Sequence, residues 1–246
     1  SPILSAKGVL AIDHQLLTLS DLVARLPHGN VTGRVSVDQR GDRKVPTVDI
    51  DLRLRGSSVQ DIAGGGGDFS GNVSARVRLK GPGETIRAAV GRSNGTIGFV
   101  ARDGHLPQGI AAALGFDAAR ALLAKDGERA GLRCVVLKLD VTRGRGRVDP
   151  MIVDTTASQL RGQGSVVFPG ETLDIRLTGT PKQHALLRLP GSAYMTGTIE
   201  RPQVTIPPEV KSVGNIFKAI GRAITGKQGP VASDADCSGL AARVLR

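Results

Sequence analysis

Aliphatic and polar residues alternate along much of the chain, which is the pattern of β-strands with one buried and one solvated face. Residues 48–55 give the clearest case, with aliphatic side chains at the even positions and aspartate or arginine at the odd ones. Residues 72–80 repeat the pattern with a strongly basic outer face, and residues 135–141 and 173–177 repeat it again. Further strands are predicted at residues 4–12, 15–25, 30–38, 95–102, 147–154, 158–168, 193–200 and 203–206.

Turn sequences separate these segments, among them His28-Gly29-Asn30 and Arg143-Gly144-Arg145-Gly146. About a dozen strands joined by such turns favour an antiparallel meander, although typical sheets have only about 4 to 6 strands. We therefore expect a mainly β fold.

Two segments follow a helical period instead. Residues 107–124 are rich in alanine, begin with a proline and repeat an apolar side chain every four residues, which predicts a helix across or at the end of the sheet. Residues 210–226 carry an apolar stripe with Lys211, Lys218 and Arg222 on the polar side. This basic amphipathic helix could lie on an anionic membrane surface or dock onto the sheet.

The predicted elements suggest a β-domain over residues 1–208, followed by the basic helix and a C-terminal tail over residues 209–246. The last residues, from Lys227 onward, are small and polar enough to predict a loose tail that closes with a short apolar turn.

Composition narrows the possible partners. The net charge of +11 favours anionic surroundings. Aromatic residues make up only 2% of the chain and are not interleaved with basic ones, so we expect no nucleic acid partner. No stretch approaches the roughly 18 apolar residues that cross a bilayer.

The sequence presents no convergent set of catalytic groups, so we expect a protein that is not an enzyme and holds no metal or cofactor. The histidines are far apart and lack metal-ligand spacing: His14, His28, His105 and His184. Asp49 and Asp51 share a strand face and could act as paired carboxylates in a polysaccharide-cleaving enzyme. Cross-strand ion pairs with the basic face are the favoured interpretation of both aspartates.

The two cysteines, Cys134 and Cys237, are too few for a zinc site or a disulfide scaffold. A cysteine within an apolar strand is often a small core residue. The alternative is a disulfide between Cys134 and Cys237, which would tie the tail to the sheet. Both interpretations remain open at this point.

The aliphatic face of the predicted sheet is larger than one helix can cover. Each larger aliphatic side chain left in water forgoes about 1.5–3 kcal/mol. A second sheet could cover the face, as in a sandwich, and so could an apolar ligand such as lipid acyl chains. The alternation pattern does not choose between them.

Several short motifs, taken in order, resemble the C-terminal region of the AsmA family. They include Val153-Asp154-Thr155-Thr156 and Leu160-Arg161-Gly162-Gln163-Gly164. Later, Gly197-Thr198-Ile199-Glu200-Arg201-Pro202 resembles the family's ending, in which Gly-Thr-Ile or Gly-Thr-Leu is followed by two variable residues and then a proline. The resemblance covers about residues 4–206, with the tail cysteine beyond it.

The resemblance implies a Gram-negative envelope protein that is periplasmic and, at full length, anchored to the inner membrane by an N-terminal helix absent from this chain. It also implies a relation to chorein-type bridge-like lipid-transfer proteins, whose curved sheet forms a long aliphatic groove. The expected fold is thus a twisted antiparallel sheet forming an open groove, or β-taco, with one or two short helices.

The expected function is to shield phospholipid acyl chains between the inner and outer membranes in support of outer-membrane biogenesis. The expected partners are acyl chains and a membrane surface or envelope proteins. The alternative is a non-catalytic interaction module that regulates outer-membrane protein assembly or targeting. The residues expected to line the groove are Val48, Ile50, Leu52, Leu54, Val73, Val77, Leu79, Leu137, Leu139, Ile175 and Leu177.

Overall fold

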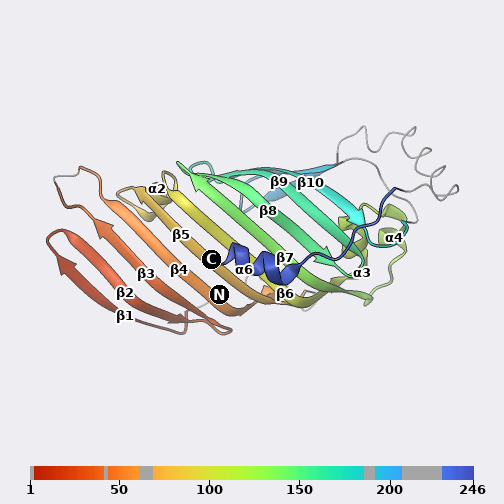
Figure 1. Ribbon diagram of the computed structural model, residues 1–246, viewed down its shortest axis with the longest axis horizontal. Helices are drawn as coiled ribbons and strands as arrows, with labels where there is room; N and C mark the ends of the chain where they lie inside the picture. Colours follow the sequence, from red (N-terminus) through yellow and green to blue (C-terminus); the bar gives the residue numbers. More distant parts are fainter. Residues whose placement is uncertain (1–2, 42–43, 61–68, 186–191, 207–228) are drawn as a thin grey trace.

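The chain folds into one antiparallel sheet of twelve strands whose spatial order is the order of the sequence (Figure 1). The computed structural model describes residues 3–41, 44–60, 69–185, 192–206 and 229–246. The strands are β1 (Ser5–Asp13), β2 (Leu16–Arg25), β3 (Asn30–Asp38), β4 (Thr47–Ser58), β5 (Asn72–Pro82), β6 (Asn94–Pro107), β7 (Arg129–Thr142), β8 (Arg145–Thr155), β9 (Ser158–Val167), β10 (Thr172–Pro181), β11 (Ala193–Gly197) and β12 (Pro202–Thr205). The predicted mainly β meander is confirmed.

Tight turns join several neighbouring strands. Arg143 and Gly144 connect β7 to β8, and both have positive φ angles, 49° and 73°. His14 and Gln15 do the same between β1 and β2, with φ angles of 41° and 67°. Two-residue turns of this kind twist in the same sense as the strands that they join, so each strand pairs with the next.

The strand register aligns the sequence alternation across the sheet. Ile50 lies opposite Val35 on one side and Leu79 on the other, and Leu139 lies opposite Ile97 and Val148. We call the face that carries these side chains the inner face. The opposite face, which carries Asp51, Arg53 and Arg76, is called the outer face.

At one end of the sheet, the helix α2 (Ile86–Val90) links β5 to β6 and also reaches the turn between β9 and β10. The Arg87 guanidinium lies 2.8 Å from the Glu171 carboxylate, and a Cβ on Gly91 would lie 3.4 Å from Pro169. In a flat sheet β6 and β9 would be about 14 Å apart, given a strand spacing of about 4.8 Å. These contacts indicate that the sheet curls at this end.

At the other end, the helix α3 (Gln108–Leu114) crosses from β6 toward β10. The Ser158 hydroxyl donates to the Ala111 carbonyl at 2.6 Å, and Leu114 and Phe116 pack against the main core. The inner face of the C-terminal strands therefore encloses a core whose buried residues are Leu79, Leu139, Val141, Val148, Leu160, Val166, Ile175, Leu177 and Ala193.

The single helix predicted over residues 107–124 is two helices, α3 and α4 (Ala118–Leu123). The break falls at Phe116, whose φ of 58° is incompatible with a continuing helix. The buried Asp117 then begins α4 by accepting a hydrogen bond from the Arg120 backbone N–H at 3.2 Å. With α2 and α6, the described residues contain four short helices, more than the one or two expected.

Residues 229–236 contain no helix or strand, as expected for a loose tail, but the short apolar turn expected after them is a helix. The helix α6 (Cys237–Val244) packs on the outer face over β6 and β7 (Figure 1). Ala241 and Val244 are buried there against Val100 and Val136. A disulfide joins Cys134 to Cys237, which corresponds to one of the two interpretations that the sequence left open. The predicted helix at residues 210–226, with Lys211, Lys218 and Arg222, lies outside the described residues.

A glycine in β6 allows α6 to approach closely. A Cβ on Gly98 would lie only 2.2 Å from the Val244 carbonyl oxygen. Any side chain at this position would displace the helix, so Gly98 is required for the packing.

Candidate functional site

The inner face changes from exposed to buried along the sheet. At the N-terminal edge, Leu10 and Ile12 are 62% and 73% exposed. They lie opposite Leu19 and Leu17, which are half-buried and continue the same face toward β3. Leu79 on β5 is only 5% exposed. The aliphatic surface is therefore continuous, and among the described strands it is exposed over the first strands and again at Val204 on β12, which is 61% exposed at the opposite edge of the sheet.

Most residues predicted to line a groove lie in the covered part of this face. Leu52, Leu54, Val77 and Leu137 are half-buried. The remaining predicted residues are buried: Val48, Ile50, Val73, Leu79, Leu139, Ile175 and Leu177. Among the described residues, the inner face is covered by the curled sheet itself and its short helices, and no second sheet packs on it.

The inner-face residues of β1 and β2, at the exposed edge of the sheet, were not among those singled out from the sequence. The alternation in residues 4–12 and 15–25 marked them as strand residues, and it also marked Leu10, Ile12 and Leu19 as sharing a face. It carried no information about which end of the face stays open. We call Leu10, Ile12, Leu17 and Leu19 the open aliphatic surface.

The edge of the sheet next to this surface is also exposed. β1 pairs with β2 alone among the described strands, and every residue of β1 is exposed. An edge strand of this kind offers backbone N–H and C=O groups to a further strand.

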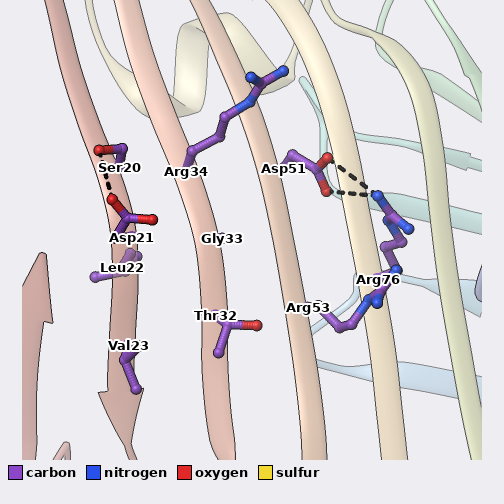
Figure 2. Close-up of a pocket in the computed structure, with 10 residues that line it drawn as sticks. All are labelled: Ser20, Asp21, Leu22, Val23, Thr32, Gly33, Arg34, Asp51, Arg53 and Arg76. Carbon is purple, nitrogen blue, oxygen red and sulfur yellow. Dashed lines mark hydrogen bonds and ion pairs between the residues drawn. The ribbon is translucent and has the colours of Figure 1, made fainter.

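The outer face contains a pocket of about 620 Å³ over β2, β3, β4 and β5 (Figure 2). Arg34, Arg53 and Arg76 line it from three neighbouring strands. The Arg76 guanidinium donates to both carboxylate oxygens of Asp51 at 3.2 Å. Burial lowers the pKa of Arg53, and the positive charge of Arg76 lowers it further.

The aspartates once considered as a catalytic pair are both in cross-strand ion pairs. Lys80 lies 3.7 Å from Asp49, and Arg76 lies 3.2 Å from Asp51. This confirms the interpretation favoured from the sequence. Within the described ranges, no three histidine, cysteine or acidic residues group as metal ligands would.

A buried carboxylate joins the tail to the sheet. Asp154 is fully buried and accepts from the Arg133 guanidinium at 2.8 Å, with the Lys182 ammonium at 2.9 Å. It also accepts from the backbone N–H of Ala235, in the segment that leads to α6, at 3.2 Å. Sequence reasoning noticed Asp154 only as part of a family motif and missed this role.

The described part of the chain has no helix with the length and hydrophobicity of a membrane span. Taken together, the open sheet and its continuous aliphatic face define a β-groove protein.

Comparison with known proteins gives one match to a curated protein. The chain is 24% identical over 140 residues to the AsmA family protein YhjG of Escherichia coli (strain K12). The match covers 55% of this chain and 20% of that relative, so the chain corresponds to a small part of the longer protein. This similarity supports membership of the AsmA family, in agreement with the order of the motifs. No family model and no solved structure matches the chain.

Proposed function

We propose that the inner face shields phospholipid acyl chains, as part of a non-catalytic lipid-transfer protein of the bacterial envelope. The observation that carries the proposal is the open aliphatic surface, where Leu10 and Ile12 remain largely exposed. Large exposed apolar patches are rare on soluble proteins, and where they occur they often mark a binding site. Aliphatic side chains with few aromatic rings match the chemistry of a hydrocarbon chain.

The geometry of the sheet suits such a ligand. β1 to β4 span about 14 Å at a strand spacing of about 4.8 Å, which leaves room for a hydrocarbon chain across their inner face. Headgroups would stay at the wet rim while the acyl chains contact the side chains. Each larger aliphatic side chain covered in this way contributes about 1.5–3 kcal/mol.

The covered half of the face has a separate role in this proposal. Leu139, Ile175 and Leu177 pack against one another and against α3, so they hold the curvature of the sheet. Acyl chains would enter from the β1 side and end where this core begins.

The proposed location is the periplasm. Disulfides persist in oxidising compartments, and the described chain contains one between Cys134 and Cys237. The AsmA relative supports an envelope protein at the level of the family. Movement of phospholipid between the inner and outer membranes, and support of outer-membrane biogenesis, follow from the same proposal.

The test is to identify lipid that copurifies with the protein. The chain is purified without detergent, extracted with organic solvent, and the extract is analysed by mass spectrometry. We expect phospholipid in the extract of the wild type. In the double variant Leu10→Asp, Ile12→Asp we expect a several-fold decrease, because two charges would replace the most exposed side chains of the open aliphatic surface.

A matched control is available on α4. Leu122 and Leu123 are 86% and 70% exposed and lie on the helix α4, not on the strands β1 and β2, so Leu122→Asp, Leu123→Asp adds the same charge elsewhere. The control should retain wild-type lipid. An extract without phospholipid, or an equal decrease in both double variants, would contradict the proposal.

The closed core supports a second candidate function. The inner face from β5 to β11 buries its own side chains, as a structural module that needs no ligand would do. Such a module would regulate outer-membrane protein assembly or targeting through protein contacts. An empty extract together with specific binding of an envelope protein would favour this alternative.

A further inference from the structure

The outer face concentrates arginines from three neighbouring strands. Arg53 on β4 lies directly opposite Arg76 on β5. In the next row, Arg34 on β3 and Arg78 on β5 lie on the two sides of Asp51. Like charges directly opposite each other destabilise a sheet. This arrangement therefore costs free energy unless an anion offsets it.

The carboxylates nearby offset only part of this charge. Asp51 contacts Arg76 with both oxygens, while Arg34 and Arg53 have no hydrogen bond or ion pair among the described residues. The Nε–H of Arg76 is buried and has no acceptor in the same part of the chain. A buried donor without an acceptor is unfavourable, and more so when the group is charged.

The pocket of about 620 Å³ gives an anion space beside these groups (Figure 2). Gly33 forms part of its floor with a φ of 147°, and a Cβ there would lie 2.0 Å from the Asp51 carbonyl oxygen. The Thr32 and Ser20 side chains add hydroxyl groups to the lining. Asp21 also lines the pocket, but it lies on β2, two strands away from Arg53.

We propose that the pocket formed by Arg34, Arg53 and Arg76 binds a phosphate group. Guanidinium groups bind phosphate through paired hydrogen bonds. Arg53 and Arg76 offer two such groups together with the unused Nε–H of Arg76, and Arg34 adds a third positive charge to the lining, although its side chain extends away from the other two (Figure 2). The phosphate belongs either to a small soluble molecule or to a phospholipid headgroup. The site lies on the face opposite the open aliphatic surface, so it is independent of acyl-chain binding.

The primary test measures binding of inorganic phosphate by isothermal titration calorimetry, with chloride at matched ionic strength as the reference. Arg53→Gln removes a charge without a partner, so the protein should stay folded. We expect this variant to bind phosphate at least tenfold more weakly than the wild type. Arg92→Gln is the matched control, because Arg92 is exposed and outside the pocket, and it should bind like the wild type.

A second variant makes the prediction in the opposite direction. Asp51→Asn removes the carboxylate that competes for Arg76, so phosphate affinity should rise several-fold. A purely structural role of the cluster would not produce this gain. Unchanged or weaker phosphate binding in Asp51→Asn that is still folded by circular dichroism would overturn the proposal.

Two further ligands distinguish a soluble phosphate from a lipid headgroup. The first is glycerol 3-phosphate, and the second is vesicles of phosphatidylglycerol, with vesicles of phosphatidylcholine as the reference. Binding of phosphate and glycerol 3-phosphate that depends on Arg53 supports a soluble ligand. Arg53-dependent binding of phosphatidylglycerol vesicles alone supports a headgroup. The proposal fails if none of these ligands binds, or if Arg92→Gln weakens binding as much as Arg53→Gln does. Lipid recovered by extraction should be the same in Arg53→Gln and the wild type.

Discussion

The disulfide between Cys134 and Cys237 should be a major source of stability for this fold. It closes a segment with a sequence separation of 103 residues. A crosslink reduces the conformational entropy of the unfolded chain, and for a loop of about 100 residues the expected stabilisation is about 4.7 kcal/mol. The bridge links β7, in the middle of the sheet, to the first residue of α6. Its loss therefore acts on the whole domain.

The perturbation is the double substitution Cys134→Ala, Cys237→Ala. Other contacts keep the tail in place in the folded variant, since the Ala232 N–H donates to the Pro181 carbonyl at 2.9 Å and Ala235 donates to Asp154. The native structure should thus persist, and the loss should appear as a decrease of about 4–5 kcal/mol in the free energy of unfolding. For a chain of this size that corresponds to a decrease in Tm of about 10–15 °C.

The assay is urea unfolding followed by circular dichroism, with and without dithiothreitol. Wild type should lose stability when reduced, whereas the double alanine variant should respond to the reductant by less than about 0.5 kcal/mol, the usual scale of a surface change. Equal stability of the oxidised wild type and the variant would refute the reasoning. It would show that the unfolded chain gains little freedom when the bridge is absent.

Three further predictions concern the attachment of the tail. Asp154→Ala removes the buried partner of Lys182 and Arg133, which keep only the exposed Asp234 as counter-ion, so it should lower the free energy of unfolding, measured in urea, by up to about 3 kcal/mol, the low end for a buried charge left without any partner. Gly98→Val should displace α6 at a cost of about 1–3 kcal/mol and speed its amide hydrogen exchange, whereas Gly170→Ala, where a Cβ has ordinary contacts, should change neither. The hydrogen bond from Lys182 lowers the pKa of Asp234. The contribution of Asp234 to folding stability is therefore present above the ordinary aspartate pKa of about 3.9 and is lost as pH falls through the lower pKa of the folded state. A pH titration by NMR should show this lowered pKa in the wild type and its return toward the ordinary value in Lys182→Met.

The two faces of the sheet divide the chemistry of the protein. The inner face carries mainly aliphatic side chains, while the outer face carries the arginine cluster around Arg53 and the helix α6. The open aliphatic surface and the arginine pocket lie on opposite faces of the sheet, so one phospholipid lying on a single face cannot contact both. The acyl-chain proposal is consequently tested by lipid extraction and the phosphate proposal by phosphate titration, and either result is independent of the other.

The alternation of residue types determined the strands, their order and their faces. Because side chains of a strand point alternately to opposite sides, Ile50 and Leu52 had to share a face, and Asp51 and Arg53 had to share the other. The cross-strand pair of Asp51 with Arg76 followed from the same alternation, since both lie on polar faces of neighbouring strands. Turn residues such as Arg143-Gly144 fixed the connections.

Only the tertiary structure decided how much of the aliphatic face is covered. Curvature of the sheet arises from contacts between distant segments, such as Arg87 with Glu171, and no local period encodes them. The same holds for Asp154, which gathers partners from β7, from the residue after β10 and from the tail. Local alternation records which way a side chain points, but burial depends on what the rest of the chain brings against it. For that reason Leu10 and Leu139 follow the same pattern in the sequence, yet one is exposed and the other lies in the core.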